Sequence, residues 1–240
     1  MGDDEAEYRR PSWGQLLMEG PAAVRLLAAQ AMPARVRDNV GRGRAVIVVP
    51  AFLANEVPTA QLKRALRACG FRAFGWGQGF NMGARPGKLR GLIARIDALA
   101  AAHGPVALVG WSLGGLYARE AAKRRPDKVR MVATLGTPFS GGLRANNAWK
   151  LYEAVNDHDV DHPPVRVDPA EKPPVPTLAF WSRRDGIVAV GSARGKEGER
   201  DRAIELHCRH NALVSDTEAL RALVRALAEQ EGEEGEEGEG

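Results

Sequence analysis

Short apolar runs alternate with stretches of helical periodicity along most of the chain. Continuous runs rich in valine, isoleucine and leucine, such as those at 45–50 and 106–109, are typical of strands buried on both faces of a sheet. The runs that predict strands are 45–50, 71–76, 106–111, 129–135, 175–181 and 203–206. Between them apolar residues recur at spacings of three and four, which predicts helices. This alternation indicates an α/β fold with a doubly wound, mostly parallel sheet and helices on both faces.

Three regions depart from this alternation. Residues 12–35 contain an amphipathic or largely apolar helical stretch, interrupted by Gly20 and Pro21, that packs on the core, dimerises or lies on a lipid surface. Residues 139–174 are rich in Gly, Asn, Asp, His and Pro, and a connection of this length is typical of a lid that lines a pocket. We therefore expect an N-terminal helical extension at 1–43, a main domain at 44–228 with a lid insertion at 139–174, and a tail at 229–240.

The composition is that of one globular domain. A length of 240 residues suits a single α/β domain, and no apolar run approaches the roughly 18 residues of a membrane-spanning helix. The acidic start of the chain does not resemble a secretory signal. Two cysteines, Cys69 and Cys208, are too few for a disulfide framework and are expected to be buried free thiols. These features favour a cytoplasmic location.

The net charge of +4 hides an uneven distribution. The last twelve residues carry seven acids and no base, so the rest of the chain has 34 bases against 23 acids. A Glu/Gly tract cannot bury apolar surface, and we expect 229–240 to be disordered. The bases of the remaining chain are scattered singly, without interleaved aromatic residues, so no nucleic-acid partner is predicted.

The run at 106–111 leads directly into Gly110-Trp111-Ser112-Leu113-Gly114, after which helical periodicity begins. A Gly-x-Ser-x-Gly segment between a strand and a helix places its serine on a sharp turn, with the side chain presented and backbone N–H groups close by. Glycines on either side avoid Cβ clashes in so tight a turn. Ser112 is therefore the candidate nucleophile.

A serine hydroxyl needs a base to remove its proton, and the base needs a third group to orient it. Functional groups of a parallel sheet lie just past the carboxyl ends of its strands. This condition selects His210, in the loop after the run at 203–206, with His207 as the alternative. The remaining histidines precede a strand or lie in the insertion: His103, His158 and His162.

Asp185 meets the same condition for the orienting acid. It follows the run at 175–181 directly, and Gly186 permits a tight turn after it. Asp201 and Asp216 are weaker alternatives.

The segment 157–162 reads Asp-His-Asp-Val-Asp-His and contains groups that can bind a metal. A polar turn before Pro163 and Pro164 explains the same residues more simply. We therefore predict neither a metal nor a cofactor.

With these residues in place, the chain resembles an α/β-hydrolase of the lipase/esterase type over roughly residues 44–228. The resemblance rests on the segments 48–54, 110–115, 135–139 and 182–188 and on the loop of His210. It implies the chain order Ser, Asp, His for the triad, and an oxyanion hole built from the backbone N–H groups of Phe52 and Leu113. Because no obvious pair of strands precedes residue 44, we expect a reduced sheet of about six strands.

The resemblance also implies a function: a serine hydrolase that cleaves small-molecule carboxylic esters through an acyl-enzyme intermediate. Apolar residues around the predicted site suggest an apolar acyl chain, and four are assigned to substrate binding: Leu53, Phe80, Trp111 and Phe139. Asn81 and Trp76 line the pocket or support the fold. Two alternatives stay open: an acyltransferase or thioesterase with the same triad, and a non-catalytic binding protein that kept the fold.

Overall fold

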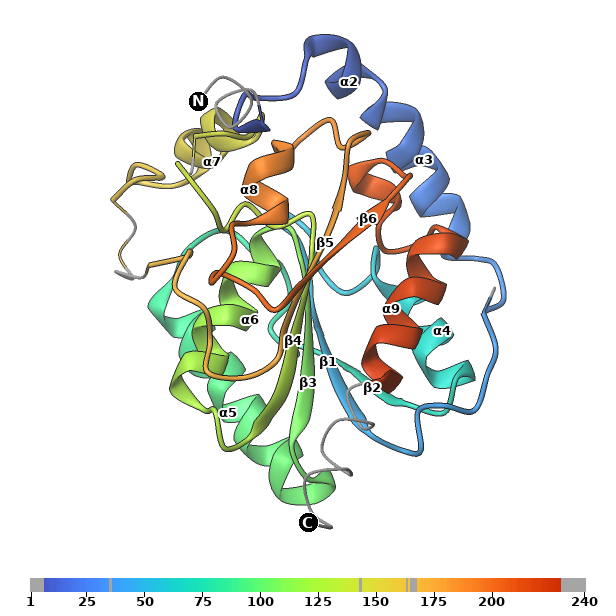
Figure 1. The fold of residues 1–240 in the computed structure, drawn as a ribbon. Helices are drawn as coiled ribbons and strands as arrows, with labels where there is room; N and C mark the ends of the chain where they lie inside the picture. Colours follow the sequence, from blue (N-terminus) through green and yellow to red (C-terminus); the bar gives the residue numbers. More distant parts are fainter. Residues whose placement is uncertain (1–6, 35, 143, 163, 165–167, 230–240) are drawn as a thin grey trace.

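Six parallel strands form a single sheet in the order β2-β1-β3-β4-β5-β6 (Figure 1). The structure is a computed structural model that describes residues 7–34, 36–142, 144–162, 164 and 168–229, so the predicted tail lies, from residue 230 on, outside the described residues. The strands are β1 Ala45–Val49, β2 Arg72–Gly75, β3 Val106–Trp111, β4 Val129–Leu135, β5 Thr177–Ser182 and β6 Arg202–Leu206. Every pairing is parallel, which confirms the predicted sheet of about six strands.

Helices cover both faces of this sheet, and each face has its own apolar core (Figure 1). One face carries α5 (Pro86–His103) and α6 (Leu113–Arg124), and the other carries α4 (Ala60–Ala68) and α9 (Thr217–Glu229). Alternate residues of β1 pack in the two cores on opposite faces of the sheet. Val46 and Val48 pack in the α4–α9 core, whereas Ile47 and Val49 pack in the α5–α6 core. This two-sided burial explains why the strand is apolar at every position.

The carboxyl ends of the parallel strands lie together at one edge of the sheet. The strand order changes direction between β1 and β3. β2 lies on one side of β1, whereas all later strands lie on the other. Such a reversal leaves a crevice above the strand ends, where ligands of open parallel sheets bind. Three short helices follow strands at or near this edge: α7 Trp149–Val155, α8 Val190–Arg194 and the 3-10 helix η1 His210–Ala212.

The described part of the N-terminal extension includes the helices α2 (Trp13–Leu17) and α3 (Glu19–Ala29) (Figure 1). Helix α3 contacts η1. The prediction that Gly20 and Pro21 interrupt this stretch is wrong. The break falls at Met18, and both residues lie in the first turn of α3. A proline is tolerated in a first turn because its missing N–H has no acceptor within the helix there.

One face of α3 packs on the core and the other faces outward. Ala22, Leu26 and Ala29 are buried, and Leu26 joins the α4–α9 core. Val24 and Leu27 are 67% and 61% exposed. No helix in the described part of the chain is long and apolar enough to cross a membrane. Of the three predicted alternatives for this stretch, packing on the core is the one that this structure contains.

Asp216 caps the start of α9. The segment 215–218, Ser-Asp-Thr-Glu, has the pattern of a capping box that begins at Ser215, but Asp216 makes the cap instead. Its Oδ1 accepts hydrogen bonds from the backbone N–H groups of Glu218 and Ala219, at 2.9 and 3.2 Å. Aspartate is a strong N-cap because it satisfies free N–H groups and places a negative charge at the positive end of the helix.

Candidate functional site

Ser112 occupies the turn between β3 and α6 in a strained conformation. Its φ of 53° and ψ of −124° are rare for a residue other than glycine. Two glycines permit this turn. A Cβ on Gly110 would lie 2.3 Å from Gly115 Cα, and a Cβ on Gly114 would lie 2.3 Å from Val49 O. The glycines of the motif are therefore required by the close contact between α6 and the strands.

Asp185 and His210 lie together at the same edge of the sheet. Asp185 Oδ2 is 2.7 Å from His210 Nδ1, and the two side chains are 1% and 2% exposed. Asp185 Oδ1 is fixed separately, because it accepts hydrogen bonds from the backbone N–H groups of Ile187 and Val188, both at 2.8 Å. The carboxylate thus orients the imidazole and leaves Nε2 for another partner.

The surroundings of His210 raise its pKa above the ordinary value of histidine. Burial disfavours the charged ring and lowers the pKa, but the charge of Asp185, its hydrogen bond and a further attraction by Glu19 outweigh burial. The ring lies beside Trp111, the residue before Ser112, with 6.1 Å between the ring centroids. Among the described residues no hydrogen bond joins the Ser112 hydroxyl to His210. Catalytic contacts of this kind often close only around the substrate.

Asn81 anchors the loop that follows β1. Its Nδ2 donates to Pro50 O at 2.8 Å, its backbone O accepts from Leu53 N–H at 2.7 Å, and its backbone N–H donates to Ala54 O at 2.9 Å. Asn81 is completely buried, so of its two predicted roles the structure favours support of the fold. Leu53 is held at a φ of 58°, an uncommon value for leucine, inside this bonded loop.

The backbone N–H groups of Phe52 and Leu113, close to Ser112, have no acceptor among the described residues. Leu113 is the first residue of α6, where an N–H has no intrahelical acceptor. Phe52 lies in the loop that packs on the same turn of α6, since a Cβ on Gly114 would lie 2.7 Å from Pro50 O. Both predicted oxyanion donors are therefore free to bind an anion.

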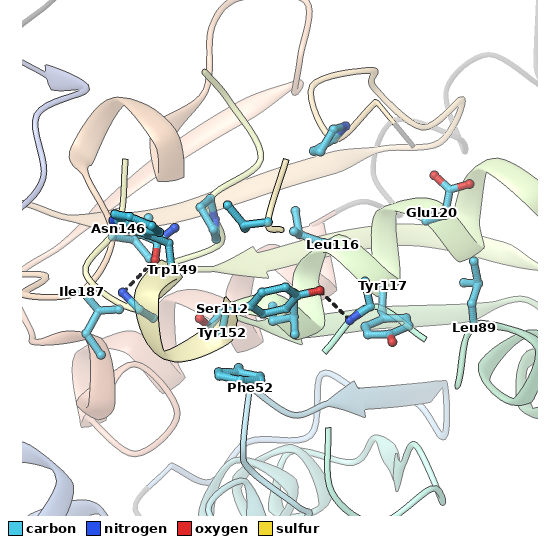
Figure 2. A pocket seen from close by; sticks show the side chains of 17 residues that line it. Phe52, Leu89, Ser112, Leu116, Tyr117, Glu120, Asn146, Trp149, Tyr152 and Ile187 are labelled. Carbon is cyan, nitrogen blue, oxygen red and sulfur yellow. Dashed lines mark hydrogen bonds between the residues drawn. The ribbon is translucent and has the colours of Figure 1, made fainter. Parts of the chain in front are cut away.

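A cavity of about 110 Å³ opens at Ser112, and its walls are mostly apolar. Figure 2 shows the lining side chains extending to both sides of Ser112. On one side lie Leu89, Leu116, Tyr117 and Glu120. On the other side lie Asn146, Trp149 and Ile187. Phe52 and Tyr152 lie close to Ser112 itself in this view.

The four residues assigned to substrate binding from the sequence do not line this cavity. Phe139 is 1% exposed and lies against Arg119, whose guanidinium is 4.2 Å from the ring centroid. Trp111 points into the α4–α9 core, because successive strand residues face opposite sides of the sheet. Phe80 and Leu53 are 55% and 37% exposed, and neither lines the cavity. A position at or just after the carboxyl end of a strand thus does not determine where a side chain points.

Residues that the sequence pattern assigns to ordinary helix faces form the cavity instead. Leu113, Leu116, Tyr117 and Glu120 recur along α6 at helical spacing, which places them on one face. Counting at helical spacing from Ser112 along the predicted helix would have identified these lining residues from the sequence. Tyr117 Oη donates to Gly83 O at 2.5 Å, and burial raises the pKa of Tyr117 to about 12, so its phenol stays neutral.

The alternative acids and bases have other partners. His207 pairs with Glu218 at 3.0 Å on the surface. Asp201 accepts a hydrogen bond from Thr177 N–H at 2.7 Å, and Asp216 caps α9. Among the residues considered as the catalytic acid or base, only Asp185 and His210 contact each other.

The insertion contributes much of the cavity wall, whereas its histidines do not line the cavity. Its lining residues are Asn146, Ala148, Trp149, Tyr152, Val160 and Pro169. His158 Nε2 is 2.9 Å from Tyr152 Oη, whereas His162 is exposed and lies near Asp159. Within the described ranges, no three His, Cys, Asp or Glu side chains gather as a metal-binding group.

Comparisons with known proteins agree with this architecture. A family model described as the alpha/beta hydrolase fold matches residues 92–168. Similar solved structures include a monoacylglycerol lipase from Paleococcus ferrophilus, with a TM-score of 0.54 and 16% identity over 78% of this chain and 96% of that one. A carboxylesterase from Bacillus subtilis has a TM-score of 0.57 and 13% identity over 89% of this chain and 98% of that one.

A third similar structure is a 2-hydroxy-6-oxo-6-phenylhexa-2,4-dienoate hydrolase from Rhodococcus sp. strain RHA1. Its TM-score is 0.54 and its identity 14%, over 78% of this chain and 91% of that one. A sequence comparison with curated proteins gives no match. At these low identities the structural similarity shows the fold alone.

Proposed function

We propose that this chain, which has the α/β-hydrolase fold, is a serine hydrolase that cleaves carboxylic esters with an apolar acyl chain. The observation that carries the proposal is the buried Asp185–His210 pair, 2.7 Å apart, at the edge where Ser112 occupies a strained turn. Strained backbone lowers the stability of a protein, and both strained residues and buried ionisable pairs are concentrated at active sites. A binding protein that merely kept the fold would not need either.

The reaction follows from these three groups. Ser112 Oγ attacks the ester carbonyl carbon while His210 Nε2 takes its proton, and Asp185 stabilises the imidazolium. The carbon–oxygen bond to the alcohol then breaks, and the imidazolium protonates the departing oxygen, which leaves an acyl-enzyme. Water then attacks the acyl carbon while His210 Nε2 takes its proton. The bond from the acyl carbon to Ser112 Oγ breaks, the imidazolium returns the proton to Ser112 Oγ, and the carboxylic acid leaves.

The negative charge that develops on the carbonyl oxygen is assigned to the N–H groups of Phe52 and Leu113. Both donors are backbone groups fixed by the loop and helix that carry them, so they need no rearrangement when charge develops. One donor of this kind contributes about 3 kcal/mol to the transition state.

We assign the acyl chain to the cavity arm along α6. From Leu113 to Glu120 the helix rises about 10 Å, the length of an acyl chain of about eight carbons. Leu116 and Tyr117 supply apolar wall, and the Glu120 carboxylate at the far end is neutralised by basic neighbours on the next turn. The arm at Trp149 then receives the alcohol.

The test is a panel of p-nitrophenyl esters and matched thioesters with acyl chains of two to sixteen carbons. We expect the highest kcat/KM near octanoyl and a loss of at least about 10³-fold in Ser112→Ala. Thr217→Ala also removes a hydroxyl, but at the first residue of α9 and away from the cavity, so it is the control and keeps wild-type rates. Full activity of Ser112→Ala refutes the proposal. A preference for thioesters, or transfer of the acyl group to an added alcohol, selects one of the alternatives that share this triad.

We also propose a cytoplasmic location. Cys69 and Cys208 are both buried and unpaired, in keeping with the reducing cytoplasm.

A further inference from the structure

Glu19, in the first turn of α3, is a buried carboxylate behind the Asp185–His210 pair. Glu19 is only 4% exposed. Oε1 accepts hydrogen bonds from Gly186 N–H at 2.9 Å and from His210 N–H at 3.0 Å, and Oε2 accepts one from Asn211 N–H at 3.0 Å. Three backbone donors thus converge on one carboxylate.

These donors belong to the two loops that carry the acid and the base. Gly186 directly follows Asp185, whereas His210 and Asn211 begin η1. A single side chain from the N-terminal extension therefore joins the two loops whose spacing sets the Asp185–His210 distance. Burying a carboxylate is unfavourable by several kcal/mol unless hydrogen bonds replace its hydration, so the position demands all three bonds.

The extension is attached to the acid loop at several further points. Gln15 Nε2 donates to Arg183 O at 3.1 Å, and Asn147 Nδ2 donates to both Pro11 O and Gly186 O, at 3.0 and 2.9 Å. The contact is close, since a Cβ on Gly186 would lie 2.4 Å from Gln15 O. These bonds place α3 so that Glu19 reaches both loops.

We propose that Glu19 is a positioning residue of the active site, which fixes the acid and base loops relative to each other and adds a second negative charge behind the imidazole. The inference rests on the proposed function, because it assigns Glu19 a part in the reaction of Ser112. Glu19 does not line the cavity, so it acts only through Asp185 and His210. The imidazolium that forms during catalysis is then stabilised by two carboxylates.

The charged groups that face His210 come from two elements: Asp185 from the loop after β5, and Glu19 from α3. Trp111 of β3 is uncharged, and burial raises the pKa of the Cys208 thiol in the same loop, so that it stays neutral. Both carboxylates favour the protonated imidazole, against the opposing effect of burial. Removing the charge of Glu19 should therefore lower the pKa of His210.

The experiment compares the full-length protein with Glu19→Gln, which keeps the shape of the side chain and removes its charge. Two quantities are measured: the pKa of His210 by NMR titration of the imidazole, and kcat and KM with p-nitrophenyl octanoate. We expect a lower His210 pKa and a fall in kcat of about ten-fold with KM nearly unchanged, because one loop donor loses its acceptor. Glu19→Asp keeps the charge and should restore the pKa but only part of kcat.

Glu7→Gln is the matched control. It makes the same change in the same segment, but Glu7 pairs with Arg194 at 2.5 Å, so the His210 pKa and kcat should equal those of the wild type. A folded Glu19→Gln variant with wild-type pKa and kcat overturns the proposal. If that variant does not fold, Glu19→Asp decides: wild-type kcat overturns the proposal, and reduced kcat with an unchanged His210 pKa supports it. Absence of ester hydrolysis by the wild type refutes the proposed function instead, and the NMR comparison still decides the role of Glu19.

Discussion

Replacing Leu116 by tryptophan tests whether the acyl chain lies along α6. Leu116 is one helical turn beyond Leu113, on the wall between Ser112 and the far end at Glu120 (Figure 2). An indole in a cavity of about 110 Å³ leaves no space for the chain beyond its first few carbons. The substitution leaves the proposed triad and the two oxyanion donors unchanged.

The expected magnitude follows from the apolar surface that the substrate no longer buries. Each buried methylene contributes about 0.8 kcal/mol, or a factor of about four in kcat/KM. An octanoyl ester has four methylenes more than a butanoyl ester, so Leu116→Trp should lower kcat/KM for octanoyl by about 200-fold relative to butanoyl. Activity toward acetyl and butanoyl esters should stay within about two-fold of the wild type, because short chains end before position 116.

The assay is kcat/KM across p-nitrophenyl esters of two to sixteen carbons, with thermal unfolding to verify that each variant is folded. Leu151→Trp is the matched control, because Leu151 lies on α7, is 51% exposed and does not line the cavity. Its chain-length profile should match the wild type. If folded Leu116→Trp keeps the wild-type ratio of octanoyl to butanoyl activity, the acyl chain does not lie along α6.

Three further predictions concern groups that hold the site. Asn81→Ala leaves the buried Pro50 carbonyl without its donor, so the free energy of unfolding in urea should fall by about 1–3 kcal/mol. Because the same loop carries Phe52, kcat should fall by a larger factor than KM rises. An unchanged kcat would show that this loop carries no oxyanion donor. The acid limb of the pH profile of kcat/KM should lie above pH 6.5, because burial lowers the pKa of His210 but Asp185 outweighs burial, and only the neutral imidazole accepts a proton. In Asp185→Asn the limb should move to lower pH while kcat falls about 10³–10⁴-fold, and a limb that does not move contradicts the assignment of Asp185. Arg119→Met removes a buried guanidinium that donates to four backbone carbonyls, three of them in the segment 169–171. The free energy of unfolding should fall by about 3 kcal/mol, and KM for long-chain esters should rise because Pro169 lines the cavity. A variant as stable as the wild type would refute the role of Arg119 in holding this segment.

The sheet and the acid–base contact could be predicted from the sequence because simple rules constrain both. A strand buried on both faces must be apolar at every position, as β1 and β3 are. Asp185 and His210 each follow a strand of a parallel sheet, and parallel strands end at one edge, so their meeting depends on order in the chain rather than on side-chain detail.

The cavity walls and Glu19 could not be predicted in this way. Trp111 and Phe139 lie at or just past the carboxyl ends of β3 and β4, but both side chains are buried away from the cavity, and this depends on strand alternation and loop conformation. Glu19 belongs to a helix whose sequence pattern shows only which face is apolar. Its bonds to the loops at Gly186 and His210 depend on where α3 docks, a tertiary arrangement that no local pattern encodes.

The most direct test of the central claim is the mass of the peptide that contains Ser112, isolated after rapid acid quenching of the enzyme during hydrolysis of p-nitrophenyl octanoate. We expect this peptide to gain one octanoyl group in the wild type. The Ser112→Ala peptide should gain none, and that variant should not turn over the ester. An unmodified Ser112 peptide, together with an octanoyl group on another residue or full turnover by Ser112→Ala, would contradict it.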